Sequence, residues 1–185
     1  MEEPPIQGVN QQVTREDWAY LAGLWDGEGS IGMNIYKAGK SQRYAVHMTL
    51  TNTDLALVNE VVRIMDVSHA PAHVSLRNRP GRLPAYQIDI RRYESCKIML
   101  ENMLPFLKGK KELAVLLLRY ITKRTETLRT QNLLTFQRNG KFASMVHLDC
   151  YTDEDKSLME QIRQLNAQRK TRNLNDYTQP QVIPG

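Results

Sequence analysis

The feature that most constrains the fold is a strict alternation of apolar and polar residues in two pairs of segments. The first pair covers residues 30–36 and 43–51, and the second covers residues 74–79 and 86–91. A period of two is typical of a strand with one buried and one exposed face. Short polar segments join the members of each pair, so the sequence predicts two β-hairpins.

Helical periodicity surrounds both hairpins, because apolar residues recur there every three or four positions. The predicted helices begin near Thr14, at Thr53 or Asp54, near Glu94, near Gly109 and after Thr152. Thr14 and Asp17 resemble a capping box at the first of these starts. The order of elements predicts an α+β fold: a curved four-stranded antiparallel sheet with helices on one face and further helices near the C-terminus.

The predicted organisation has four parts. Residues 1–12 form a flexible polar arm, and residues 13–128 form the core domain. Residues 129–172 form a helical extension with a basic tail, and residues 173–185 are expected to be disordered. No apolar run approaches the roughly 20 residues that a membrane-spanning helix needs, so no membrane partner is expected.

Charge is distributed unevenly along the chain. Nine Lys and Arg residues lie between positions 108 and 141, against only Glu112 and Glu126, in a chain of net charge +5. This pattern indicates either a solvated helix face or an anionic partner such as nucleic acid. Cys96 and Cys150 lie far apart and suggest no disulfide framework. The N-terminus has neither a signal-peptide nor a transit-peptide pattern, so we expect an intracellular protein.

A short motif carries more specific information. The nine residues from Leu21 to Gly29 read LAGLWDGEG and resemble the signature of the LAGLIDADG homing endonucleases. The order of elements resembles that family as far as about Arg124. The segment PFLKGKK at 105–111 resembles the one that supplies the family's active-site lysine, and residues 163–166 resemble its C-terminal helix. The resemblance is to the single-motif, homodimeric type, and it implies the αββαββα LAGLIDADG fold.

Small residues in the first helix would let a second copy approach closely, and one motif per chain implies a two-fold dimer. The expected interface residues are Ala19, Ala22, Gly23 and Asp26. Alternatively, the small residues pack on the chain's own sheet. Asp26 is expected to brace either the helix ends or the interface rather than to bind metal.

The resemblance also implies a catalytic centre. Glu28 would bind a divalent metal through its side chain and Gly27 through its carbonyl, with Mg²⁺ or Mn²⁺ as cofactor. Carboxylates suit such hard cations, although the family most often has Asp at the position of Glu28. Asn52 would help to hold the attacking water, and Lys110 would either neutralise phosphate charge or tune the nucleophilic water. In the alternative interpretations Glu28 and Asn52 are ordinary turn residues and Lys110 is a solvated helix-start charge.

The polar face of the sheet is the expected DNA-reading surface. A strand of about nine residues spans about 30 Å, close to the ~34 Å of one DNA turn. The expected readers are Ser30, Gly32, Asn34, Tyr36, Arg43, His47, Thr49, Ser75, Arg77, Arg79, Gln87, Asp89 and Arg91. Arg77 and Arg79 suit guanine, whereas Asn34 and Gln87 suit adenine. Lys108, Lys141, Arg169, Lys170 and Arg172 are expected to contact phosphates.

Together these features predict a homing endonuclease subunit. Its homodimer would make a double-strand break in a long pseudo-palindromic DNA site by metal-dependent phosphodiester hydrolysis. The alternative is an RNA-binding intron maturase or a non-cutting DNA-binding protein of the same fold. The expected compartment is an organelle (chloroplast or mitochondrion) or the prokaryotic cytoplasm.

Overall fold

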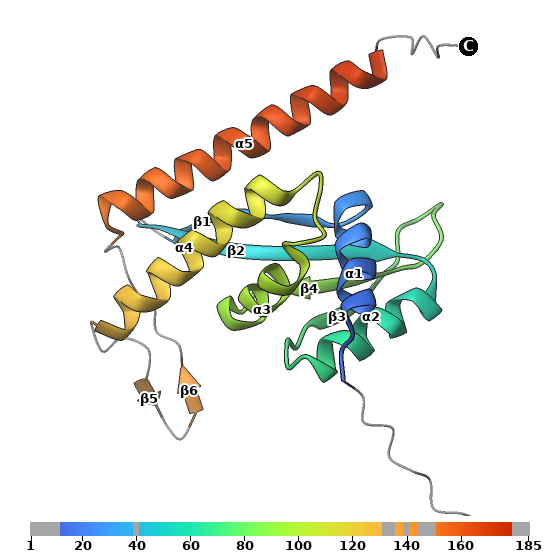
Figure 1. The fold of residues 1–185 in the computed structure, drawn as a ribbon, viewed down its shortest axis with the longest axis horizontal. Helices are drawn as coiled ribbons and strands as arrows, with labels where there is room; N and C mark the ends of the chain where they lie inside the picture. Colours follow the sequence, from blue (N-terminus) through green and yellow to red (C-terminus); the bar gives the residue numbers. More distant parts are fainter. Residues whose placement is uncertain (1–11, 39–40, 131–135, 139–140, 144–150, 179–185) are drawn as a thin grey trace, which may run out of the picture.

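The computed structural model describes the backbone of residues 12–38, 41–130, 136–138, 141–143 and 151–178 (Figure 1). Side chains are described for residues 12–36, 44–130 and 151–169. The elements are α1 (Arg15–Gly27), β1 (Ser30–Ala38), β2 (Ser41–Asn52), α2 (Leu55–Val67), β3 (His73–Arg77), β4 (Ala85–Ile90), α3 (Tyr93–Met103), α4 (Lys111–Thr130), β5 (Phe136–Arg138), β6 (Lys141–Ala143) and α5 (Asp153–Thr178).

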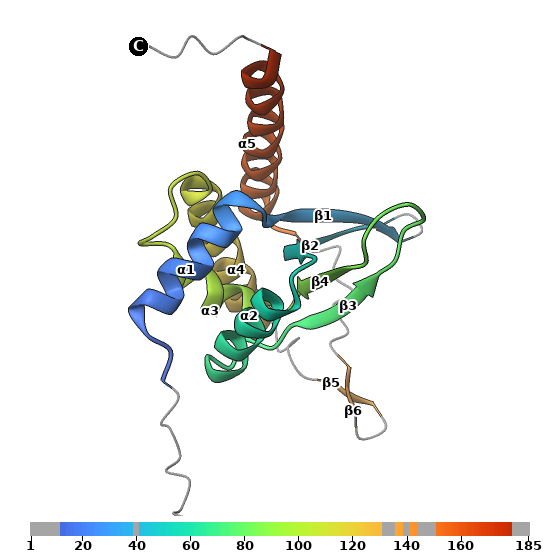
Figure 2. The same cartoon turned by 90° about the vertical axis from the view of Figure 1, so that its right-hand side faces the viewer.

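The predicted α+β architecture is confirmed. The main sheet has four strands in the order β1-β2-β4-β3, and every neighbouring pair is antiparallel. Figure 2 shows α1, α2, α3 and α4 gathered on one side of these strands. The apolar side chains of the strands, among them Val46, Met48 and Ile88, are fully buried there against the helices. The alternation in the sequence therefore separates a core-facing side of the sheet from a polar side.

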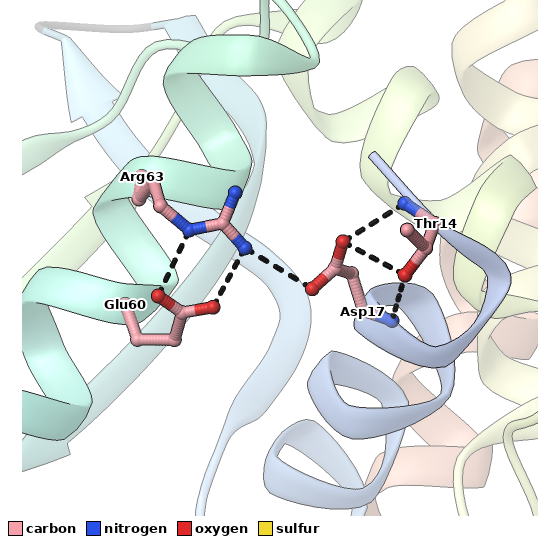
Figure 3. Close-up of polar contacts among 4 residues, drawn as sticks. All are labelled: Thr14, Asp17, Glu60 and Arg63. Atoms are coloured by element: carbon pink, nitrogen blue, oxygen red, sulfur yellow. Dashed lines mark hydrogen bonds and ion pairs between the residues drawn. The ribbon is translucent and has the colours of Figure 1, made fainter. Parts of the chain in front are cut away.

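Helix α1 begins with the capping box that the sequence predicts. The Thr14 N–H donates to Asp17 Oδ2 at 2.8 Å, and the Asp17 N–H donates to Thr14 Oγ1 at 3.1 Å. The hydrogen bond from the Thr14 backbone and the charge of Arg63 both lower the pKa of Asp17. The Nη2 atom of Arg63, on α2, lies 2.7 Å from Oε1 of Glu60 on the same helix and 3.1 Å from Oδ1 of Asp17 on α1 (Figure 3). The contact with Asp17 joins the two helices. A partly exposed pair of this kind contributes up to about 1 kcal/mol.

The C-terminal region differs from the prediction in its boundaries. Helix α4 continues to Thr130, two short strands β5 and β6 follow, and a single helix α5 runs to Thr178. The segment expected to be disordered therefore begins inside a helix. Residues 1–11 and 179–185, which belong to the predicted arm and tail, lie outside the described residues. In the part of the chain that the structure describes, no helix is long and apolar enough to span a bilayer.

Helix α5 lies alongside α4 and continues beyond it (Figure 1). Leu158, Met159 and Ile162 of α5 are buried in the same core as the sheet. Arg124 of α4 and Asp155 of α5 form a buried ion pair at 3.7 Å, and the Arg124 guanidinium lies 4.5 Å from the centre of the Tyr151 ring. Because a buried charge is costly unless it is paired, this contact fixes one end of α5 on α4.

The turn from α1 into β1 depends on one glycine. A Cβ added to Gly29 would lie 2.6 Å from Trp25 Cδ1 and 2.7 Å from Trp25 Cα, which is closer than real contacts allow. Trp25 is fully buried and has little room to move. The absence of a side chain at Gly29 therefore lets the chain reverse tightly over the end of α1.

We predict that Gly29→Ala lowers the free energy of unfolding by about 1–3 kcal/mol, the usual cost of overpacking. Urea denaturation measures this directly. Gly27→Ala is the matched control, because nothing lies within 4 Å of a Cβ at Gly27. Equal stability of the Gly29→Ala and control proteins would contradict the close approach of Gly29 to Trp25.

Candidate active site and nucleic-acid interface

The end of α1 presents a carboxylate to solvent. Glu28 is the C-cap residue of this helix, and its N–H donates to the Leu24 carbonyl at 2.8 Å. The chain then turns over Trp25 at Gly29 into β1. The Glu28 side chain is exposed, at the level where the first strand of the sheet begins.

Asn52 lies at the end of β2, and its side chain is hydrogen-bonded to the side chain of Glu28. Its Nδ2 donates to Glu28 Oε2 at 2.8 Å, while its Oδ1 accepts the Asp54 N–H at 2.8 Å. The second contact fixes which end of the amide faces Glu28, because an N–H can only be accepted by the oxygen. Two of the three predicted catalytic residues, Glu28 and Asn52, are therefore in direct contact.

Lys110 approaches the end of α1 from the segment between α3 and α4. Its Nζ donates to the carbonyls of Trp25 and Asp26 at 2.5 and 2.6 Å. The ammonium thus satisfies carbonyls at the end of α1, where a cation is favourable. Burial lowers the pKa of Lys110, the Arg169 guanidinium lowers it further, and Asp26 acts in the opposite direction.

Asp26 holds the start of α4. Its carboxylate accepts the backbone N–H groups of Lys108, Gly109 and Lys110 at 2.6, 3.0 and 2.8 Å. An anion at this position satisfies donors that a helix start leaves unpaired. Of the two roles that the sequence leaves open for Asp26, the structure shows the bracing of helix ends.

The donors around Glu28 fit a hard divalent cation. In the described residues, no three His, Cys, Asp or Glu side chains lie close enough to form a metal cluster. Mg²⁺ is usually held by one or two carboxylates, with phosphate and water oxygens completing its shell. An exposed carboxylate next to the Gly27 carbonyl matches that requirement, and the remaining ligands would come from outside the chain.

The polar face of the sheet brings together most of the predicted readers. The register places Ser30 opposite Thr49, Thr49 opposite Asp89, and Ser75 opposite Gln87. The exposed or half-exposed members of this face are Ser30, Asn34, Tyr36, His47, Thr49, Ser75, Arg77 and Gln87. Arg79 and Arg91 are exposed just beyond the ends of β3 and β4. The face is therefore continuous across all four strands.

Two predicted readers are not available on this face. Gly32 is buried, and the space in front of it is taken by His47 and by Asn166 of α5, whose nearest atoms lie 3.2 and 3.3 Å from an added Cβ. Asp89 is only 4% exposed. Alternation correctly places both residues on the polar face, but it does not show how deeply neighbouring side chains cover them.

Ala22 is also misassigned as an interface residue. It is fully buried in the chain's own core, beside Leu21 and Trp25. Ala19 and Gly23 are exposed, and nothing lies within 4 Å of a Cβ at Gly23. A small residue suits a chain's own core as well as an interface, so its size alone did not identify the side that faces outward.

The structure describes the side chains of only some of the remaining residues that are predicted to contact DNA. Lys108 is exposed before α4, and Arg169 lies on α5 with its Nη2 3.8 Å from an added Cβ at Gly109. Arg169 is thus next to the Lys110 segment. The side chains of Arg43, Lys141, Lys170 and Arg172 lie outside the described residues.

The sequence prediction leaves out several residues of this region, among them His73 and Asn166. His73 pairs with Asp89 and stands on the polar face, a position that the alternation of His73, Ser75 and Arg77 does indicate. Asn166 reaches the start of β1 from α5. The resemblance at residues 163–166 includes Asn166 but assigns it no contact, because its position depends on how α5 packs against a distant part of the chain.

Comparisons with known proteins agree with this geometry. No family model and no curated protein matches the chain. The chain is similar in structure to the homing endonuclease I-CvuI, which was solved in complex with the I-CreI target in the presence of magnesium. The TM-score is 0.50 and the sequence identity 18%, and the match covers 80% of this chain and 98% of that chain. The archaeal intron-encoded homing endonuclease I-Vdi141I, complexed with DNA, gives a TM-score of 0.50 and 10% identity, over 80% and 97% of the two chains. The chain therefore has the fold of the LAGLIDADG homing endonucleases, as its motif predicts.

We predict that Asp26→Ala destabilises the protein by about 1–2 kcal/mol, the usual cost of losing a helix cap. The three N–H groups before α4 would lose their carboxylate acceptor, which urea denaturation at fixed protein concentration would reveal. Asp66→Ala is the control, because Asp66 is exposed at the end of α2. Equal midpoints for the two variants would show that Asp26 does not hold the start of α4.

Proposed function

We propose that the chain is one subunit of a homodimeric, divalent-metal-dependent endonuclease that cuts both strands of a specific DNA duplex. The observation that carries this proposal is the convergence of Glu28, Asn52 and Lys110 beside a polar, partly basic sheet face. A carboxylate, an amide and an ammonium around the end of one helix are a suitable set for phosphodiester hydrolysis.

The dimensions of the sheet support a duplex as the ligand. β1 has nine residues, so it spans about 30 Å, close to the ~34 Å of one turn of DNA. A twisted sheet of that length can follow the major groove over one half-site. Two such sheets related by a two-fold axis would cover around 20 base pairs of a pseudo-palindromic site.

The exposed side of α1 supports a dimer. Ala19, Tyr20, Gly23 and Gly27 lie at helical spacing, and all four are exposed although the opposite side of the helix is buried in the core. Open space in front of Gly23 would let a second α1 pack closely. Because Glu28 follows directly at the end of this helix, pairing would bring two carboxylates together near the axis.

The roles of the residues follow from their contacts. Glu28 and the Gly27 carbonyl would hold Mg²⁺ or Mn²⁺, which supplies Lewis-acid stabilisation and a nucleophilic water when bound. Asn52 orients the Glu28 carboxylate and helps to hold the attacking water. Lys110, positioned by the carbonyls of α1, neutralises charge on the phosphate. Arg169 lies close enough to the Lys110 segment to contact the same DNA strand.

Glu28→Gln is predicted to abolish DNA cleavage while leaving duplex binding within about threefold of the wild type. Glutamine can still accept the Asn52 hydrogen bond, but it lacks the negative charge that a hard cation requires. Incubation with a plasmid library of randomised inserts and Mg²⁺, followed by sequencing of the linear products, measures cutting.

Glu101→Gln, an exposed substitution on α3, is the control and should cut as the wild type does. Persistent cutting by Glu28→Gln would contradict the role of Glu28. Binding of duplex without cutting by the wild type would favour a non-cutting DNA-binding protein, and selective binding of intron RNA would favour a maturase.

Gly23→Leu is predicted to make the protein monomeric. The added side chain would occupy the space that a second α1 needs, and its Cβ would meet nothing of the chain itself within 4 Å. Light scattering at micromolar concentration should give the mass of two chains for the wild type and of one chain for this variant. Ala56→Leu, at an exposed position in α2, is the matched control, and a wild-type mass of one chain would contradict the proposed dimer.

A further inference from the structure

A chain of side-chain hydrogen bonds crosses the polar face from β4 to β3. Asp89 accepts from Gln87, and Gln87 in turn accepts from Arg77. The three residues differ in burial: Asp89 is buried, Gln87 is half-buried, and Arg77 is exposed at the end of β3. The chain of contacts therefore runs from the interior of the face outward to solvent.

Asp89 is poorly placed to contact a base itself. It is 4% exposed, and a buried carboxylate must be paired and hydrogen-bonded. Its partners are the Gln87 Nε2, at 3.0 and 2.9 Å from the two carboxylate oxygens, and the Arg91 Nη2 at 3.5 Å. A nearby His47 is half-buried, and its pKa is lowered by burial although the charge of Asp89 opposes that shift.

The two contacts with the Asp89 carboxylate determine the orientation of the Gln87 amide. A carboxylate can only accept hydrogen bonds, so it selects the NH₂ end of the amide and turns the Oε1 outward. That oxygen accepts the Arg77 Nε–H at 3.0 Å. Gln87, which the sequence assigns to adenine, has both ends of its amide engaged in this way.

The same contact determines how Arg77 is presented. With Nε–H bound to Gln87, the guanidinium plane is held and its two terminal nitrogens, Nη1 and Nη2, remain directed away from that bond. Two parallel N–H donors match the O6 and N7 acceptors of guanine in the major groove. A flexible arginine would lose conformational entropy on forming this pair, whereas a held one loses less.

We propose that Asp89 is a positioning residue, which orients Gln87 and through it holds Arg77 as the reader of one guanine in each half-site. This inference rests on the proposed DNA-binding function of the sheet, and it concerns specificity rather than cutting. It replaces the direct base contacts predicted for Asp89 and Gln87 with an indirect role for both. One guanine preference should then depend on three residues together.

The test uses the full chain and a library of randomised duplexes, with base preference measured at every position of the bound pool. Arg77→Ala identifies the base pair that Arg77 reads. Asp89→Asn and Gln87→Met should each reduce the guanine preference at that same pair by about tenfold, within the range for a lost bidentate contact. Glu101→Gln, at an exposed position of α3 and not on the sheet, is the control and should leave this pair unchanged.

A DNA-free measurement accompanies the binding experiment. In ¹⁵N NMR, the Arg77 Nε–H signal should be protected from solvent exchange in the wild type and lose that protection in Asp89→Asn and in Gln87→Met. Gln87→Met keeps the length of the side chain, so it can replace Asp89→Asn in both measurements if Asp89→Asn folds poorly.

The possible outcomes separate the two proposals. An unchanged guanine preference in both Asp89→Asn and Gln87→Met, in a protein that selects DNA, overturns the positioning role alone. Unchanged exchange protection of Arg77 in these variants also overturns it. Absence of any selective duplex binding by the wild type overturns the proposed function, and the reading role with it.

Discussion

The reciprocal contact between Asp26 and Lys110 is the interaction on which the candidate site depends. The Asp26 carboxylate, from the end of α1, accepts three backbone N–H groups at the start of α4. The Lys110 ammonium, from the start of α4, donates to two carbonyls at the end of α1. Each helix thus supplies the charge that the other helix end favours. The two segments are 84 residues apart in sequence, and this exchange brings them to one point.

The two sides of the sheet have different roles: the apolar side contributes to stability, and the polar side is the proposed recognition surface. The apolar side is buried with the helices in one core, so the exposed positions of the polar side can vary without loss of core packing. The residues of the polar side also differ in burial. Asp89 is buried and holds Gln87 by a hydrogen bond, whereas Arg77 is exposed. Specificity at such a surface depends on supporting residues as well as on those that touch DNA.

The sequence alone predicts much of this arrangement, for identifiable reasons. Alternation has a fixed period, so both hairpins and their two faces follow from it. The capping box at Thr14 and Asp17 is a local signal and is confirmed. The motif resemblance points to Glu28, Asn52 and Lys110, and the structure brings Asn52 into contact with Glu28 and Lys110 to the end of α1.

What the sequence does not predict depends on tertiary packing. The periodic pattern shows which side a residue faces but not how deeply it is covered, so Asp89 and Gly32 are misassigned as readers. Ala22 is small enough for either side of α1, and only the packed core shows that it faces inward. The position of Asn166 beside Gly32 depends on α5, whose placement is set by the buried pair of Arg124 and Asp155.

The most direct test is a crystal structure of the chain bound to a duplex that it selects, grown with Ca²⁺. A functional metal site at the end of α1 predicts a cation about 2.3–2.6 Å from the Glu28 carboxylate, in contact with a phosphate of the DNA. A duplex that occupies the polar face of the sheet with no cation beside Glu28 would contradict the assignment of a nuclease.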